Sequence, residues 1–437
     1  MTNEQAVQEK VVLVGLATSN GGIEAAEGSL DELAALADTA GAEVVDRIVQ
    51  VRRKPDPATF IGQGKAKEVV AKARMLDAQA IIFDDELSPA QGRNLEDVAA
   101  VNPLAPNALK IIDRTGLILD VFAQHSHSAE GNLQVELAQI NYMVPRLRGW
   151  GEVLSRIGGG AARGGGGAIG TRGPGETQLE VDRRKIQRRL KKLKSDLSDL
   201  ERTRDIRRKQ RVKGSTPQVS LVGYTNAGKS TLLNALTGAG VLVEDRLFST
   251  LDPVARRMEL PDGSPAVLID TVGFVSKLPH QLVEAFRSTL EESLHADLLL
   301  HVVDASAVDP RAKAEAVDGV LKEIGAEEIP RLVVLNKADV VSDDDRRRLL
   351  TQFPGSVMIS AKSGEGVAEM LEEVRRRLDS ARTIAVFKVP FDKGKVRSQL
   401  HAEGEILEET HDESGTKLVA RVPAPLLKRM SEYVSTE

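Results

Sequence analysis

Apolar runs and helical patterns alternate along residues 11–125. Repetition of strand, helix and strand predicts a parallel sheet covered by helices. We predict strands at Val11–Val14, Val44–Val51, Ala80–Phe83 and Leu109–Ile112, and helices at Ser29–Ala40, Gly64–Leu76 and Pro89–Ala99. Ser29 and Glu32 have the spacing of a capping box, which places the start of a helix at Ser29.

Two longer helical patterns follow and predict an antiparallel hairpin. Apolar residues recur at intervals of four and three in each pattern, which is typical of a coiled-coil seam. The seams are Leu133, Leu137, Ile140 and Val144 in the first helix, and Ile186, Leu190, Leu193, Leu197 and Leu200 in the second. Thr177 and Glu180 have capping-box spacing at the start of the second helix.

Beyond residue 213, apolar runs again end at loops rich in Gly, Asn and Asp. We predict strands at Gln218–Val222, Ala266–Ile269, Asp297–Val303 and Arg331–Leu335, and an amphipathic helix at Val283–Leu294. The last part reads as strand Ile384–Val389, helix Gly394–Ala402, a hairpin around residues 413–415 and helix Ala424–Tyr433. We assign no chemistry to this last unit.

A phosphate-binding loop follows the first of these strands. The run from Gly223 to Ser230 reads G-x-x-x-x-G-K-S and lies between a predicted strand and a predicted helix. Backbone amides and the helix N-terminus supply positive charge for phosphate. We expect Lys229 to reach the β- and γ-phosphates and the Ser230 hydroxyl to bind Mg²⁺. The structural alternative is a glycine-rich turn with an incidental Lys-Ser pair.

Further short motifs indicate guanine nucleotides, and those at 336–339, 270–273 and 360–362 each follow an apolar run. The Asp339 carboxylate of Asn336-Lys-Ala-Asp339 can accept hydrogen bonds from both N1–H and the exocyclic amine of guanine, a donor pair that adenine lacks. Asp270 can hold Mg²⁺ through water, and the Gly273 amide can sense the γ-phosphate. Thr250 is the natural second Mg²⁺ hydroxyl. In this order the motifs predict a GTP-binding domain.

The predicted nucleotide contacts form one set. We expect GTP or GDP to contact Gly223, Tyr224, Thr225, Asn226, Ala227, Gly228, Lys229, Ser230, Thr231, Phe248, Ser249, Thr250, Leu251, Asp252, Asp270, Thr271, Val272, Gly273, Asn336, Lys337, Asp339, Ser360, Ala361 and Lys362. The predicted metal ligands are Ser230 and Thr250.

The predicted fold class is α/β and multidomain. It comprises a parallel-sheet N-terminal domain (1–127), an antiparallel helical hairpin (128–213) with a Gly/Arg-rich loop (150–176), a P-loop GTPase domain (214–381) and a small α+β C-terminal domain (382–437).

The sequence resembles the bacterial HflX GTPases. Their motifs are similar to the runs Gly223–Ser230, Phe248–Pro253 and Asp270–Phe274, and upstream to the runs that begin at Pro55, Leu133 and Gly173. The resemblance covers residues from about 10 to about 380. It implies a GTPase that binds the large (50S) ribosomal subunit and its rRNA and helps to split or rescue ribosomes.

The connection between the hairpin helices is rich in glycine and arginine. Residues 150–176 hold ten glycines from Gly158 to Gly175, together with Arg156, Arg163 and Arg172. A linker without function is the alternative. Because a closed helix pair needs only a few connecting residues, we favour a segment that orders on a phosphate-rich surface.

The second hairpin helix is strongly basic. Residues 182–213 hold fifteen Lys and Arg against five acids, a local net charge of +10 in a chain of net charge −5. Such a run is often only a solvated face. Its length and single sign favour RNA-backbone binding, with Arg188, Arg189 and Lys192 as candidate contacts.

Composition adds weaker limits. The chain has no cysteine, which excludes disulfides and thiolate metal sites and suits a cytoplasmic protein. We find no signal peptide and no apolar stretch long enough to span a membrane. We expect a monomer away from the ribosome.

Two alternatives to a ribosome-associated GTPase stay open. One is an ATP- or GTP-dependent RNA-remodelling protein with a second nucleotide site in the N-terminal domain, at Gly62-Gln-Gly-Lys65, where a plain turn is favoured. The other is a regulatory RNA-binding module with vestigial hydrolysis, which the number of GTP motifs argues against.

The catalytic residue is not evident. Phe274 stands where many GTPases carry the Gln that orients water, so we expect slow intrinsic hydrolysis completed by a partner. Some related GTPases hold K⁺ with an Asn in the phosphate loop. Asn226 has that position, and a plain hydrogen bond within the loop is the equal alternative.

Overall fold

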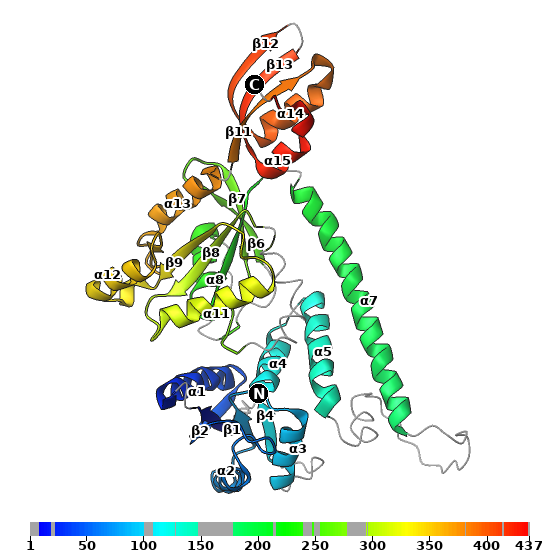
Figure 1. Cartoon of the computed structure of the whole chain (residues 1–437), viewed down its shortest axis with the longest axis vertical. Helices are drawn as coiled ribbons and strands as arrows, with labels where there is room; N and C mark the ends of the chain where they lie inside the picture. The colour runs from blue at the N-terminus through cyan, green and yellow to red at the C-terminus, as the bar shows by residue number, and fades with distance from the viewer. Residues whose placement is uncertain are drawn as a thin grey trace, which may run out of the picture. The chain divides into compact units, whose positions relative to one another are not determined.

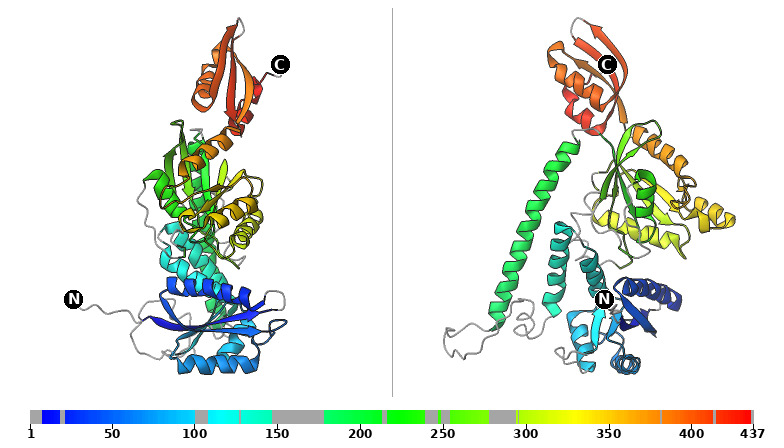
Figure 2. Two further views of the ribbon diagram at one scale, coloured as in Figure 1. Left: turned by 90° about the vertical axis from the view of Figure 1, so that its left-hand side faces the viewer. Right: turned by 180° about the vertical axis from the view of Figure 1, so that it is seen from behind.

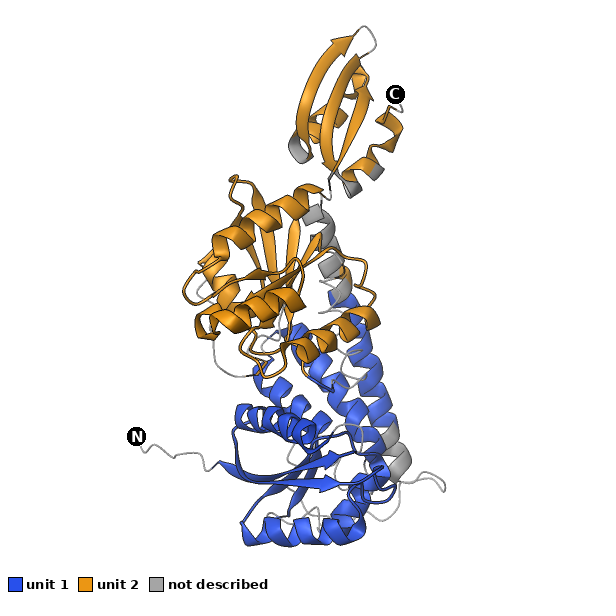
Figure 3. Ribbon diagram, turned by 60° about the vertical axis from the view of Figure 1, so that its left-hand side comes forward, with its two compact units in different colours: residues 1–200, 276–286 blue, residues 201–275, 287–437 orange. Residues whose placement is uncertain are grey.

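The computed structural model divides into two compact units (Figure 3). Residues 1–200 with 276–286 form the first, and residues 201–275 with 287–437 form the second. The structure describes residues 8–18, 22–99, 108–126, 128–146, 178–212, 216–238, 247–248, 254–277, 294, 296–380, 382–412 and 415–435. An α/β architecture with parallel sheets is confirmed, and the four-part division stays a prediction.

A parallel sheet forms the centre of the first unit (Figures 1 and 2). Among its described residues the strands lie in the order β2-β1-β3-β4, with every neighbouring pair parallel. The strands are β1 (Glu9–Ala17), β2 (Ala42–Val51), β3 (Ala80–Phe83) and β4 (Lys110–Asp113). Each predicted strand is therefore confirmed. The order places β2 and β3 on opposite sides of β1, a topological switch point between β1 and β3.

Helices cover both faces of this sheet. They are α1 (Gly22–Thr39), α2 (Gln63–Met75), α3 (Pro89–Val98) and α4 (Arg114–His125). Figures 1 and 2 place α1 and α2 on opposite faces. Apolar residues of β1 and β3 pack against α2 and α3 in a continuous core that includes Val12, Val69, Phe83 and Leu95.

The predicted start of α1 is wrong. The helix begins at Gly22, and Ser29 and Glu32 lie in its interior rather than at a capping box. The Ser29 hydroxyl instead donates to Asp84, and Glu32 pairs with Arg114. Helix α4 was not predicted. Its first turn is fully buried and apolar residues surround its axis, so it lacks an amphipathic signature.

Two further helices, α5 (Ala129–Met143) and α7 (Gln178–Val212), correspond to the predicted hairpin. On α7 the five predicted seam residues are among the less exposed ones, and Leu193 is fully buried. On α5 the buried face holds Gln134, Val135 and Ala138 instead of the predicted seam, because α5 packs on α4. The capping residue Thr177 lies outside the described residues.

A mainly parallel sheet organises the second unit. Its described strands lie in the order β10-β9-β8-β5-β7-β6, with only β6 antiparallel to its neighbour. They are β5 (Gln218–Gly223), β6 (Val254–Glu259), β7 (Pro265–Asp270), β8 (Leu298–Asp304), β9 (Arg331–Asn336) and β10 (Val357–Met358). The predicted strands here are confirmed, and the predicted helix 283–294 falls almost wholly outside the described residues.

Helices flank this second sheet. They are α8 (Lys229–Thr237), α11 (Pro310–Glu323), α12 (Asp343–Gln352) and α13 (Val367–Ser380). The apolar stripe of α13, with Met370, Val374 and Leu378, packs into the same core as β5, β8 and β9. The sheet thus carries the loops at its carboxyl ends on a rigid support.

The C-terminal part folds around an antiparallel sheet of order β11-β13-β12 among its described residues. Its elements are β11 (Arg382–Val389), α14 (Gly394–Glu403), β12 (Glu405–Asp412), β13 (Gly415–Pro423) and α15 (Ala424–Arg429). The predicted element order is confirmed, except that α15 stops at Arg429 and a short 3₁₀ turn follows. Across the described ranges, no helix is long and apolar enough to cross a membrane.

Candidate functional site

The phosphate-binding loop joins the end of β5 to the start of α8. A Cβ added at Gly223 would lie 2.3 Å from the backbone oxygen of Val302. A Cβ at Gly228, where φ is +91°, would lie 2.2 Å from the side-chain nitrogen of Asn336. Both positions therefore require glycine, because neighbouring strands approach the loop too closely for a side chain.

Asn336, at the end of β9, ties two loops of the site together. Its amide nitrogen donates to the backbone oxygen of Ala227 at 2.8 Å, and its amide oxygen accepts from the Ala361 backbone N–H at 2.9 Å. The side chain is 2% exposed. One buried amide thus fixes the distance between the phosphate loop and the loop after β10.

Lys229 is buried under the same loop. Its ammonium group donates to the backbone oxygens of Gly223 at 3.1 Å and Tyr224 at 2.9 Å. Burial lowers the pKa of Lys229 to about 8, and the nearby Asp270 carboxylate partly opposes this shift. The Lys229 ammonium is therefore held as a hydrogen-bond donor at the loop. Its burial makes the charged form less favourable than it is in water.

Two of the oxygen-bearing side chains that are predicted to hold Mg²⁺ meet at the start of α8. The Ser230 hydroxyl donates to a carboxylate oxygen of Asp270 at 2.8 Å, and both residues are buried. The Thr271 hydroxyl donates to the backbone oxygen of Leu221 at 2.7 Å and holds the end of β7 beside β5. A hydroxyl and a carboxylate in contact fit the oxygen coordination that Mg²⁺ prefers. Thr250, the other predicted ligand, lies outside the described residues.

The predicted base-recognition residues lie on the loops after β9 and β10. Asp339 is exposed, and a hydrogen bond from Ser360 is the largest of the effects that hold the pKa of its carboxyl below the ordinary value. The carboxylate is therefore ionised at neutral pH. Lys337 adopts φ +67° and its ammonium lies 2.8 Å from a carboxylate oxygen of Asp304.

Asp304 was not named from the sequence, although a signal existed. It ends β8, so its carboxylate stands at the same sheet edge as the predicted motifs. It pairs with Lys337, whose backbone has the positive φ that is uncommon outside glycine.

The segment after β7 lies against the phosphate loop. The Thr225 backbone N–H donates to the Phe274 backbone oxygen at 2.7 Å, and the Phe274 N–H donates to the Gly223 oxygen at 3.1 Å. A Cβ on Gly273 would lie 2.8 Å from the Thr225 methyl carbon and 3.0 Å from the Lys229 nitrogen. Residues 273–274 therefore contact the loop that is predicted to bind phosphate.

The structure brings together the described members of the predicted nucleotide set from four loops. The loops follow β5, β7, β9 and β10. Phe248 is buried with φ +60°, whereas Ser249, Thr250, Leu251 and Asp252 lie outside the described residues.

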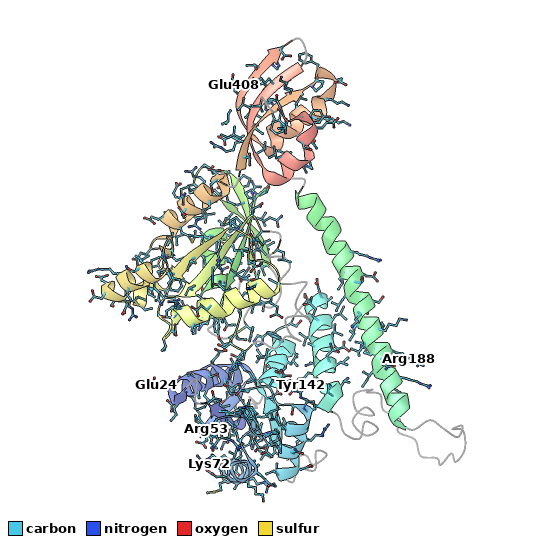
Figure 4. The ribbon with its side chains drawn as sticks, viewed as in Figure 1. Glu24, Arg53, Lys72, Tyr142, Arg188 and Glu408 are labelled. Atoms are coloured by element: carbon cyan, nitrogen blue, oxygen red, sulfur yellow. The ribbon has the colours of Figure 1, made fainter. Side chains whose placement is uncertain are left out.

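The predicted RNA contacts are only partly described. Arg188 and Lys192 on α7 are exposed, and Figure 4 draws Arg188 on that helix. Arg189 instead pairs with Glu136 of α5, with a nitrogen-to-oxygen distance of 2.6 Å. Its charge is therefore partly neutralised within the protein. Arg156, Arg163 and Arg172 lie outside the described residues.

Three family models match successive parts of the chain. A GTP-binding GTPase N-terminal model matches residues 27–123, a GTP-binding GTPase middle-region model matches 125–211, and a 50S ribosome-binding GTPase model matches 218–337. The chain is 45% identical to a GTPase HflX from Caldanaerobacter subterraneus over 98% of this chain and 94% of the relative. The chain belongs to the HflX GTPase family. A relative of the same name from Escherichia coli is 43% identical over 90% of this chain and 89% of the relative.

Solved structures include a GTP-binding protein from Sulfolobus solfataricus in complex with GDP. It is 22% identical and covers 85% of this chain and 99% of that chain, with a TM-score of 0.41. The predicted membership of the HflX family is thus confirmed by sequence relatives. As members of this family are GTPases, the chain is assigned to the GTP hydrolases, and GTPases generally use Mg²⁺.

Proposed function

We propose that this protein hydrolyses GTP on the large ribosomal subunit and uses GTP as a switch to dissociate, rescue or remodel ribosomes. The single observation that carries the nucleotide part is the Asn336 side chain. Its two hydrogen bonds join the loop suited to phosphates to the loop suited to the base. Asp339, ionised beside Ser360, then selects guanine.

In this proposal the nucleotide contacts are the described residues of the four loops together with residues 249–252. Lys229 would neutralise the β- and γ-phosphates, and the Ser230 hydroxyl and, through water, the Asp270 carboxylate would hold Mg²⁺. Bound Mg²⁺ would shield the phosphate charge during attack by water. Phe274 offers no side-chain hydrogen bond to that water, so the partner surface completes the geometry and intrinsic turnover is slow.

The ribosome part is supported by family membership and by the charge on α7. A sequence stretch of net charge +10 suits a phosphate-rich surface, and Arg188 and Lys192 are exposed for contact. The proposal places the protein in the cytoplasm, as a monomer away from the ribosome. A second nucleotide site in the N-terminal domain is less well supported, because the Arg52 side chain fills the space beside Gly62 and donates to Ile61.

We predict that the α7 charges and the Gly/Arg loop contribute to different steps. Replacing residues 158–170 with a short Gly-Ser link should leave most subunit affinity intact but impair splitting, since the α7 charges remain. Replacing Arg188 and Lys192 with Glu should weaken binding to the subunit. The slope of log affinity against log salt concentration should become shallower by about 0.7 to 0.9 for each phosphate contact that is lost. Cosedimentation with 50S subunits at several salt concentrations, and light scattering of 70S ribosomes, measure the two effects.

Charge reversal of Arg347 and Arg348 provides the matched control. These two exposed arginines lie on α12, outside the proposed RNA surface. If their reversal weakens 50S binding as strongly as reversal on α7, the basic helix is not the contact. If the loop-replaced protein splits ribosomes at the normal rate, the loop is a linker and the assignment of the loop is wrong.

The site also supports a proposed role for K⁺. Asn226 lies inside the phosphate loop and has a φ of +58°. This left-handed backbone conformation is uncommon for residues other than glycine. A bound K⁺ there would add positive charge that an arginine supplies in other GTPases. We expect ribosome-stimulated turnover to be faster in KCl than in NaCl at equal ionic strength, and Asn226→Ala to remove the difference. Equal wild-type rates in both salts contradict the role.

A further inference from the structure

One buried hydroxyl of the phosphate loop has no hydrogen-bond partner within the described part of the chain. It belongs to Thr225, the third residue of that loop, which is only 6% exposed. The buried hydroxyls of Ser230, Thr271 and Ser360, on the same group of loops, each have a partner. Burial of an unpaired hydroxyl is unfavourable. In a site whose other buried hydroxyls are satisfied, it indicates a contact that a ligand completes.

The direction of the Thr225 side chain is restricted by its neighbours. The Thr225 backbone N–H donates to the Phe274 carbonyl at 2.7 Å. A Cβ added at Gly273 would lie 2.8 Å from the Thr225 methyl carbon and 3.0 Å from its Cα. The methyl group therefore packs against the segment after β7. Because a β-branched side chain is stiff at χ1, a fixed backbone and a packed methyl group leave the hydroxyl little freedom.

Thr225 also lies beside the cation that is expected to bind the terminal phosphate. The same added Cβ at Gly273 would lie 3.0 Å from the Lys229 ammonium nitrogen. The side chains of Thr225 and Lys229 thus approach one point next to Gly273. We expect Lys229 at the β- and γ-phosphates and the Gly273 amide at the γ-phosphate. A hydroxyl in this position is near the phosphate that GTP has and GDP lacks.

We propose that the Thr225 hydroxyl donates a hydrogen bond to an oxygen of the γ-phosphate and so favours GTP over GDP. A hydroxyl rotates to suit its acceptor, and its hydrogen bond to an anionic oxygen is stronger than one between neutral groups. Phe274 offers no such side-chain contact. This inference rests on the proposed GTP site and deepens it by assigning a specificity-determining residue for the terminal phosphate.

Equilibrium binding of GDP and of a non-hydrolysable GTP analogue to the full-length protein tests this role. Thr225→Val keeps the shape of the side chain and removes the hydroxyl. We expect it to weaken binding of the analogue by about tenfold or more, the effect of one hydrogen bond to a charged group, and GDP affinity by less than about twofold. Thr225→Ser keeps the hydroxyl and removes the methyl group, so it should retain the wild-type ratio of the two affinities.

Thr237→Val is the matched control. The Thr237 hydroxyl donates to the Leu233 backbone oxygen at 2.8 Å, at the opposite end of α8 from the phosphate loop. Its removal should leave the ratio of the two affinities unchanged. An equal shift of the ratio in Thr237→Val would assign the effect to helix α8 in general and overturn the role of Thr225.

Three other results also overturn that role. They are an unchanged ratio in Thr225→Val, a shift in Thr225→Ser as large as that in Thr225→Val, and an equal loss of GDP and analogue binding in Thr225→Val, which would show a structural role. GDP binding by the wild-type protein separates this inference from the function on which it rests. Wild-type protein that binds neither nucleotide overturns the proposed GTP site itself.

Discussion

Asp339→Asn is expected to convert the protein from a GTP-binding to a xanthosine-triphosphate-binding protein. The carboxylate accepts two hydrogen bonds from guanine, whereas the Asn amide offers a donor that matches the extra carbonyl of xanthine. Hydrogen bonds to charged groups contribute about 1.5 to 3 kcal/mol each, so loss of both should weaken GTP binding by at least about 100-fold. Competition between the two nucleotides for the wild-type and variant proteins measures the exchange.

The position of Ser360 makes this test specific. The Ser360 hydroxyl keeps Asp339 ionised and oriented, and it can bond an Asn side chain in the same place, so the variant should keep its local structure. Asp343→Asn is the control, because Asp343 is also exposed and lies only four residues away at the start of α12. An unchanged preference for GTP in Asp339→Asn would refute the assignment of the base-recognition residue.

The motif-bearing loops could be predicted because their chemistry is local. The phosphate loop needs two glycines and a Lys-Ser pair at fixed spacing, and the strands before the loops are short apolar runs. The geometry around Gly223 and Gly228 explains the spacing, since the Val302 and Asn336 neighbours leave no room for a Cβ. The sequence could not specify which neighbours these are.

The errors have equally specific causes. The spacing of Ser29 and Glu32 matches a capping box, but two polar residues three apart also occur inside a helix, where these two face Asp84 and Arg114. Helix α4 is buried along most of its length, so its apolar residues are not confined to one face. The spacing of apolar residues in its sequence therefore favours neither a helix nor a strand.

Replacing Lys229 is expected to have the largest effect on hydrolysis. In Lys229→Ala the donor next to the phosphates is lost, and loss of one such donor typically costs on the order of 100- to 1,000-fold in turnover. Nucleotide binding should weaken as well, because no other cation replaces the buried charge. Lys313→Ala is the control, since this lysine of α11 lies 5.2 Å from the centre of the Tyr224 ring and is not among the predicted nucleotide contacts. Normal turnover in Lys229→Ala would mean that the loop is not the site.

The pKa of Lys229 gives the same assignment a second, independent readout. Burial lowers this pKa to about 8 in the free protein. Bound phosphates stabilise the ammonium form and raise the pKa again, so the nucleotide complex holds more protons than the free protein at pH 8 to 9. Affinity for GDP should therefore fall as pH rises from 7 to 9. Binding should also take up protons, which calorimetry detects in buffers of different ionisation enthalpy.

Lys229→Arg keeps its charge throughout this range. It should bind more weakly because its geometry differs, but it should take up no proton. Equal proton uptake in Lys229→Arg and wild type would assign the titration to another group.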